Sequence, residues 1–395
     1  MRKLLLASVA SLIFSTSAFA EDIKIGIILG FTGPIESLTP AMAQGAEAAI
    51  AEVSASGQLL SGSTVTAIRA DSTCIDSAVA SANAEKLITA DKVNGIMGAD
   101  CSGVTGAILA NVAMANGMVM ISPSATSPAL STAEDNGLFF RTAPSDARQG
   151  AIMSSVLMDR GITSVAVSYT NNDYGKGLAD AFQAAYVADG GSVTINAAHE
   201  EGKADYSSEV GALASAGGQA LVVAGYIDGA GKNVTQGAID TGAFDMFLFP
   251  DGMIGANLEN FGTDLDGSLG TVPGLDPTNP AASAMVKIGE ANGFAGGDAF
   301  VGESYDAAAL MLLAMASAKS SDPQVYKDHV MKVANGTGEK IYPGELAKGI
   351  KLASYGVAID YVGASSVTLI GPGEAAGNFR EIEIQNGKMV DVNYR

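Results

Sequence analysis

From residue 21 onward, short apolar runs alternate with longer stretches whose apolar residues recur at helical spacing. Residues 23–29 are almost all apolar, as in a strand that is buried on both faces of a sheet. Further strand patterns lie at 64–70, 94–99 and 118–122, and helical patterns lie between them at 42–53, 76–90 and 103–115. Strands separated by helices of this length are typical of βαβ units, so the pattern predicts a parallel sheet covered by helices.

A second series of the same kind begins after residue 144. It predicts helices at 147–160, 176–188, 206–216 and 230–240, and strands at 164–169, 192–197, 220–226 and 246–250. A Gly/Pro-rich stretch at 270–280 ends this series. Three more helices are predicted at 281–292, 303–320 and 343–354, and a hairpin with an Asn386-Gly387 turn at 382–390. The late helices have no sheet of their own, so we expect the chain to return to the first unit and to form two lobes.

The N-terminal segment has the pattern of a secretory signal peptide. Residues 1–3 include two basic residues, 4–14 are mostly apolar, and Ala18-Phe19-Ala20 is a small-x-small cleavage site. The mature chain is therefore expected to begin at Glu21, which predicts a protein exported to the periplasm. The apolar run is shorter than the roughly 20 residues that span a bilayer, which disfavours the alternative of an uncleaved anchor.

Composition narrows the class of partner. The chain is 48% hydrophobic and 16% charged, as expected of a compact globular protein, and its 395 residues favour two domains. Without Arg2 and Lys3 it would carry 20 basic and 42 acidic residues, a net charge of −22. Such a charge argues against binding to nucleic acid or to an anionic membrane surface.

The two cysteines, Cys74 and Cys101, are predicted to form a disulfide, because an exported chain meets an oxidising compartment. A metal site is the alternative. It is disfavoured because only His199 and His329, both far away in the sequence, could complete the ligand set.

Sequence motifs for catalysis or cofactor binding are missing. Neither histidine lies near a Gly-x-Ser-x-Gly motif, and the sequence has no Walker loop, no His-Glu-x-x-His and no paired CxxC. His329 is placed in a charged helix, and His199 at a surface or a strand end. Gly26, Gly30 and Gly33 do not have dinucleotide-loop spacing. We therefore expect a protein that binds without catalysis and needs no cofactor.

Polar residues follow three of the predicted strands. Ser102 comes after strand 94–99, and Ser124 and Thr126 come after strand 118–122. Their hydroxyls and the nearby backbone N–H groups would suit a small carboxylate, although helix capping and turns use the same residue types. Asp251 follows a buried strand within Pro250-Asp251-Gly252, which is also an ordinary turn sequence. In open α/β sheets, ligands bind beyond such strand ends.

Several of these motifs together resemble the periplasmic leucine/isoleucine/valine-binding protein family. They are spread in consistent order over nearly the whole mature chain: Gly30-Phe31-Thr32-Gly33-Pro34, Asp71 with Cys74, Cys101-Ser102, residues 121–128, Asn172-Asp173-Tyr174-Gly175-Lys176-Gly177 and residues 361–366. The resemblance implies a type I periplasmic binding fold, with two Rossmann-like lobes, parallel sheets and three hinge crossovers. The implied lobes are 21–143 with 274–372, and 144–273 with 373–395.

The resemblance also implies a ligand site. Ser102, Ser124 and Thr126 match positions that hold an α-carboxylate, Asp251 matches the acid that takes the α-ammonium, and Tyr174 and Tyr226 match aromatic positions on the second lobe. Two departures leave the side-chain preference open. The family more usually has Glu at the Asp251 position, and the loop 35–38 lacks an expected aromatic residue.

These observations predict a monomeric periplasmic binding protein that delivers a small, aliphatic or branched-chain amino acid to a membrane ABC permease. Three alternatives remain. The same fold could bind an amide, a urea-like compound or an aromatic acid. The chain could be a secreted ligand-sensing module, or a secreted hydrolase, which the missing nucleophile–base set opposes.

Overall fold

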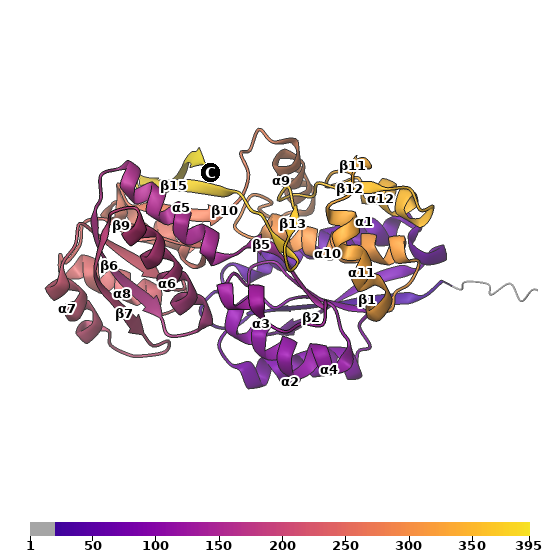
Figure 1. Ribbon diagram of the computed structural model, residues 1–395, viewed down its shortest axis with the longest axis horizontal. Coiled ribbons are helices and arrows are strands. Elements are labelled where there is room, and N and C mark those ends of the chain that lie inside the picture. The colour runs from indigo at the N-terminus through magenta and orange to yellow at the C-terminus, as the bar shows by residue number, and fades with distance from the viewer. Residues whose placement is uncertain (1–19) are drawn as a thin grey trace, which may run out of the picture.

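The computed structural model describes residues 20–395, and the predicted signal peptide lies almost entirely outside this range. Two lobes lie side by side, each built on a seven-stranded sheet between helices (Figure 1). The predicted α/β class and the two lobes are confirmed. None of the helices in residues 20–395 combines the length and the hydropathy that crossing a membrane requires.

The first sheet carries the strands of the first series. In spatial order its members are β13 (Leu369–Ile370), β14 (Glu374–Ala375), β5 (Phe139–Pro144), β4 (Met120–Ser122), β3 (Gly95–Gly98), β1 (Asp22–Leu29) and β2 (Thr64–Asp71). From β14 to β2 all neighbours are parallel, and β1 pairs in register with β2 from Asp22↔Thr64 to Leu29↔Asp71. Strand β5 was not predicted. Its residues are buried, but Arg141 and Thr142 interrupt the apolar run.

The second sheet holds β16 (Lys388–Tyr394), β15 (Phe379–Gln385), β10 (Leu269–Pro273), β9 (Phe247–Phe249), β8 (Ala220–Ala224), β6 (Ser164–Thr170) and β7 (Ser192–His199). Strands β6 to β10 are parallel, whereas β15 and β16 form the predicted antiparallel hairpin. Strand β10 replaces part of the predicted Gly/Pro-rich connection. Gly270 fits there because a side chain would meet the Ile254 side chain at 2.8 Å.

Helices cover both faces of each sheet. On the first sheet, α1 (Thr39–Ser56), α10 (Val301–Ala318), α11 (Pro323–Ala334) and α12 (Leu346–Ser354) form one layer, while α2 (Ser77–Thr89), α3 (Ser102–Ile108) and α4 (Met114–Asn116) lie on the other face (Figure 1). In the second lobe, α5 (Asp146–Asp159) packs on α6 (Asp173–Ala188), and α7 (Ser207–Ala216) packs on α8 (Ala230–Asp240). Helix α9 (Pro280–Asn292) lies beside the junction, and a small sheet pairs β11 (Glu339–Ile341) with β12 (Ile359–Tyr361).

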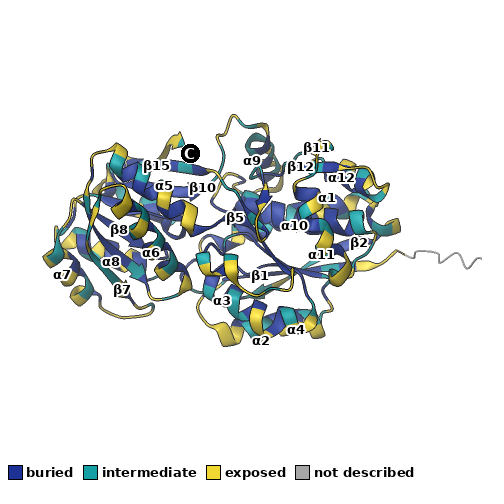
Figure 2. Ribbon diagram, in the orientation of Figure 1, coloured by how far each residue is buried: buried dark blue, intermediate teal, exposed yellow. Residues whose placement is uncertain are grey.

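Helix α10 shows why the chain returns to the first lobe. It is apolar around most of its circumference and almost entirely buried, because it lies between the strands β3 to β5 and the helices α1, α11 and α12 (Figure 2). A helix that is apolar on all sides needs such surroundings. The predicted return of the late helices to the first unit is thereby confirmed. The charged helix around His329 is α11, a fourth helix after residue 280.

Residue type predicts helix starts at Asp76, as a cap, and at Thr39-Pro40, as a cap and first turn. Asp76 caps α2 as this predicts and accepts hydrogen bonds from the N–H groups of Ala78 and Val79, both at 3.0 Å. Thr39 is not a cap but the first helical residue of α1, with Pro40 behind it. Its hydroxyl instead donates to the Gly30 carbonyl at 3.0 Å and ties the helix to the end of β1.

The chain changes lobe three times: between β5 and α5, after β10, and between β14 and β15. The predicted number of crossovers is confirmed. Because Glu374 and Ala375 pair with β5, the last change of sheet follows residue 375 rather than residue 372.

Candidate functional site

An enclosed pocket lies between the lobes, at the carboxyl ends of the parallel strands of both sheets. The free space inside it is small, about 20 Å³. Five of the six predicted ligand-binding residues line it. The full lining is Ile35, Leu38, Met42, Asp100, Cys101, Ser102, Ser124, Tyr174, Tyr226, Asp251, Gly252 and Phe300.

The first-lobe wall consists of the two predicted turns. Ser102 begins α3, is 2% exposed, and accepts a hydrogen bond from the Ser127 N–H at 3.1 Å, which leaves its hydroxyl proton free to donate. Ser124 donates to the Asp100 carbonyl at 3.1 Å. Thr126 does not line the pocket. It is 1% exposed, and its hydroxyl has no hydrogen-bond partner within the described chain.

A disulfide between Cys74 and Cys101 fixes the turn that carries Ser102. The Cα atoms lie 5.1 Å apart, within the normal range for a disulfide. Asp100, which directly precedes Cys101, accepts hydrogen bonds from the Gly30 N–H at 2.6 Å and the Ser72 hydroxyl at 2.8 Å. These contacts join the ends of β1, β2 and β3 and set the position of the first-lobe wall.

The second-lobe wall places two tyrosines against one acid. Tyr174 and Tyr226 stack with ring centroids 5.1 Å apart. The Tyr174 hydroxyl donates to Asp251 Oδ1 at 2.6 Å, and the Gly252 N–H reaches the same oxygen at 2.9 Å. Asp251 Oδ2 therefore has no hydrogen bond among the described residues. Asp251 is 2% exposed, and burial raises its pKa to about 6 although Tyr174 and Gly252 favour the ionised form.

A second buried acid beside Asp251 escaped the sequence analysis. Asp146 begins α5 at the first crossover and is fully buried, and neither carboxylate oxygen has a hydrogen-bond partner in residues 20–395. Burial and the charge of Asp251 raise the pKa of Asp146 well above its usual value, while Arg141 and Thr126 oppose the increase. Acidic residues are common in the first turn of a helix, so the position of Asp146 directly after Ser145 gave no indication of a binding site.

Phe300 is the other residue that the sequence analysis missed. It precedes α10 with φ +62°, a conformation that bulky residues rarely adopt outside functional or strained positions. With Ile35, Leu38 and Met42 it makes the apolar part of the pocket. The aromatic residue that the loop 35–38 lacks is thus supplied by a distant segment.

Direct contacts join the lobes beside the pocket. Asp228 of the second lobe donates its N–H to the Pro34 carbonyl at 2.9 Å, and its carboxylate accepts the Ser37 N–H at 2.8 Å. A side chain at Gly255 would meet Leu38 at 2.5 Å. The lobes are therefore closed over the pocket.

His199 has a structural role. It ends β7, is 1% exposed, and shares a 2.8 Å hydrogen bond between its Nδ1 and the Ser168 hydroxyl. Burial lowers its pKa to about 4, so the ring is neutral at pH 7.

Residues 22–344 match the periplasmic binding protein family. The chain belongs to this family. A relative within it, the Leu/Ile/Val-binding protein of Escherichia coli K12, is 30% identical over 323 residues, which cover 81% of this chain and 86% of that protein. The Leu/Ile/Val-binding protein homolog 1 of Brucella suis is 32% identical over 332 residues, covering 82% and 86% of the two chains.

Solved periplasmic binding proteins share the two-lobed fold. A leucine-binding protein from Thermotoga maritima superposes with a TM-score of 0.78 at 23% identity, covering 94% of this chain and 98% of that one. A solute-binding protein from R. palustris in complex with 4-hydroxybenzoate gives 0.76 at 18% identity, covering 95% and 97%. At these identities the likeness concerns the fold.

Proposed function

We propose that this protein is a periplasmic solute-binding protein that closes on a small aliphatic amino acid and presents it to an ABC permease. Residues 1–20 would direct export and be removed. The observation that carries the proposal is the pocket itself, where the buried Asp251, with a second buried acid, Asp146, behind it, lies across from hydroxyl-rich turns. No step of this function makes or breaks a covalent bond.

Each end of an amino acid has a complementary wall. Asp251 Oδ2 and Asp146 would receive the α-ammonium, because an unpartnered buried carboxylate is stabilised by a charged donor. The Ser102 hydroxyl would donate to the α-carboxylate, and Ser124 and Thr126 would do so only after a rotation of their side chains, because Ser124 donates to the Asp100 carbonyl and Thr126 lies behind the pocket wall. Tyr174 and Tyr226 would cover the backbone atoms of the ligand from the second lobe.

The remaining wall favours an aliphatic side chain. Ile35, Leu38, Met42 and Phe300 offer only apolar surface, and none of them can hydrogen-bond a polar side-chain group. Branched-chain amino acids fit this surface, and the names of the Escherichia coli and Brucella suis relatives agree with that choice. Because Ile35, Tyr226 and Asp251 line this pocket from both lobes, the ligand would enter while the lobes are apart, and closure would then bury it.

A thermal-shift screen of the mature chain tests this function. We expect leucine, isoleucine or valine to stabilise the protein, by about 2.7 kcal/mol at 100 times the dissociation constant. Acetamide, urea and 4-hydroxybenzoate represent the alternative ligands. Stabilisation by one of these, with none by the branched-chain amino acids, would contradict the proposal.

A matched pair of variants locates the binding event. Asp251→Asn should reduce the thermal shift to a third or less at the same ligand concentration, whereas Asp240→Asn, at a position on the surface of α8 in the same lobe, should leave it unchanged. If the ligand raised the melting temperature of both variants equally, it would bind outside this pocket.

A further inference from the structure

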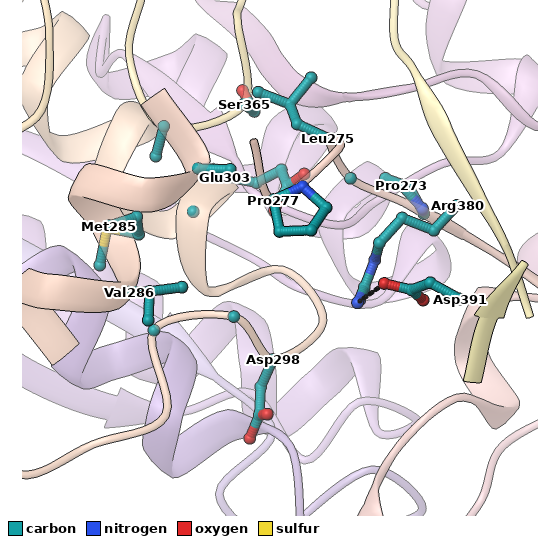
Figure 3. Close-up of a pocket in the computed structure, with 16 residues that line it drawn as sticks. Pro273, Leu275, Pro277, Met285, Val286, Asp298, Glu303, Ser365, Arg380 and Asp391 are labelled. Atoms are coloured by element: carbon teal, nitrogen blue, oxygen red, sulfur yellow. Dashed lines mark hydrogen bonds and ion pairs between the residues drawn. The ribbon is translucent and has the colours of Figure 1, made fainter. Parts of the chain in front are cut away.

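A second cavity, separate from the inter-lobe pocket, lies beside the hinge. Its volume is about 100 Å³, and it is bordered by α9, by the start of α10, by the crossover that follows β10, and by β15 and β16 (Figure 3). Two of the three lobe crossings thus pass along its wall. Its lining is Pro273, Gly274, Leu275, Pro277, Ala282, Met285, Val286, Gly296, Gly297, Asp298, Gly302, Glu303, Ala364, Ser365, Arg380 and Asp391.

The chemistry of this cavity centres on Glu303. The residue is 5% exposed, and its backbone carbonyl accepts a hydrogen bond from the Thr142 hydroxyl at 2.8 Å. Throughout residues 20–395, no other residue donates a hydrogen bond to its carboxylate, which lines the cavity. A buried carboxylate in this state lacks the partner that such groups normally have.

The other charged groups around the cavity do not supply that partner. Arg380 on β15 pairs with Asp391 on β16 at 3.5 Å, on the opposite side from Met285 and Val286 (Figure 3). Asp298, in the loop before α10, adds a negative charge at the rim. Asp306, one turn further along α10, accepts hydrogen bonds from Tyr361, Ala364 and Ser365. The cavity therefore carries an excess of negative charge.

Apolar surface makes up the rest of the wall. Pro273, Leu275, Pro277, Met285 and Val286 line it, and Met285 is 2% exposed. A wall of this kind next to one unpartnered acid fits a cation with a short hydrocarbon part. A bare metal ion fits poorly, because the described residues contain no cluster of three potential metal ligands.

We propose that this hinge cavity is a binding site for a small primary alkylammonium cation, with Glu303 as its counter-ion. The ammonium donates to the Glu303 carboxylate, and the alkyl part packs against Pro277, Met285 and Val286. A cavity of about 100 Å³ has room for ethylammonium, which has only three non-hydrogen atoms. This site is independent of the ligand proposed for the inter-lobe pocket.

The protonation of Glu303 gives the site a pH dependence. Burial and the charge of Asp306 raise the pKa of Glu303 to about 7, and Arg380 opposes the increase. An alkylammonium group, like a lysine side chain, stays protonated up to about pH 10. Binding should therefore strengthen as the pH rises through 7, because the carboxylate then ionises while the ligand keeps its charge.

The test titrates the mature protein with ethylammonium chloride at constant ionic strength and pH 8.5, with the Met285 methyl group as NMR reporter. A three-atom ligand has a best possible dissociation constant of about a millimolar. We expect saturable binding in this range or weaker, with at least tenfold lower affinity at pH 5.5. Ethanol, a neutral molecule of the same size, should not bind.

Three variants identify the site. Glu303→Gln should weaken ethylammonium binding at least tenfold and remove its pH dependence, whereas Glu290→Gln, an exposed position on α9, should change neither. Asp251→Asn should also leave binding unchanged, which separates this cavity from the inter-lobe pocket. Absence of saturable binding, equal affinity in Glu303→Gln, or loss of binding only in Asp251→Asn would each overturn the proposal.

Discussion

Buried carboxylates occur in two contrasting settings in this protein. In the first-lobe core, Asp306 accepts hydrogen bonds from the Tyr361 hydroxyl at 2.7 Å, the Ala364 N–H at 2.6 Å, and the N–H and hydroxyl of Ser365 at 2.8 and 2.6 Å. Near Asp251, behind the inter-lobe pocket, Asp146 is equally buried, and its carboxylate accepts no hydrogen bond from the described chain. The first arrangement joins α10 to the segment that follows β12. The second leaves a buried carboxylate without hydrogen-bond donors, which is normally unfavourable.

This contrast separates structural acids from candidate binding acids. A buried charge is tolerated when the surrounding protein supplies donors, and an acid without them requires a proton or a ligand. Asp100 belongs to the structural group, because Gly30 and Ser72 both donate to it. Asp251 is intermediate between the structural acids and the candidate binding acids, because Tyr174 and Gly252 donate hydrogen bonds to only one of its oxygens.

The largest effect should come from removing the structural acid. Asp306→Ala leaves four donor groups without an acceptor, so the free energy of unfolding should fall by about 3–5 kcal/mol. Asp146→Asn removes no hydrogen bond and should change it by less than about 1 kcal/mol. Urea unfolding of both variants at pH 7 measures the difference. Equal losses would mean that Asp146 also stabilises the fold.

A smaller effect should appear in the pH dependence of the ligand-free protein. Burial raises the pKa of Asp251 from 3.8 to about 6, so between these values the folded state binds more protons than the unfolded state. This contribution therefore adds stability as the pH falls from about 7 to 4. One pKa unit corresponds to 1.36 kcal/mol, so the whole rise corresponds to about 3 kcal/mol, of which about 2 kcal/mol is gained between pH 7 and pH 4.

The comparison between wild type and Asp251→Asn isolates this contribution. In the variant, the gain in unfolding free energy between pH 7 and pH 4 should be smaller by that amount. Affinity for an amino acid should show the opposite trend and weaken below pH 6, because a protonated Asp251 no longer attracts the ammonium. If the free energy of unfolding changed with pH in the same way in both proteins, Asp251 would not contribute to this pH dependence.

The sequence predicted best where the signal was local or periodic. The parallel strands β1 to β4 and β6 to β9 followed from apolar runs, and the cap at Asp76 and the turn at Asn386-Gly387 followed from residue type. Strands β5 and β10 were missed because polar residues or glycine interrupt their apolar runs, and their burial arises from packing between lobes and helices.

Only part of the candidate site could be predicted from the sequence. Ser102, Ser124 and Asp251 follow strands directly, so their place beyond the sheet edges could be inferred from strand order. Phe300 reaches the pocket from the start of α10, and Asp146 comes near Asp251 from the first crossover, which no local pattern indicates. Their roles depend on which segments lie opposite one another after the lobes close.

Binding of the α-ammonium by the unpartnered acids is the central claim, and calorimetry with two ligands tests it most directly. Leucine and 4-methylpentanoate share a carbon skeleton and a carboxylate, but only leucine carries the ammonium. Asp251→Asn should weaken leucine binding by about 2–5 kcal/mol, which is roughly 30- to several-thousand-fold, because the ammonium loses its buried counter-ion. The variant should change the affinity for 4-methylpentanoate less than about threefold. An equal loss for both ligands, or leucine affinity within threefold of the wild type, would contradict the account.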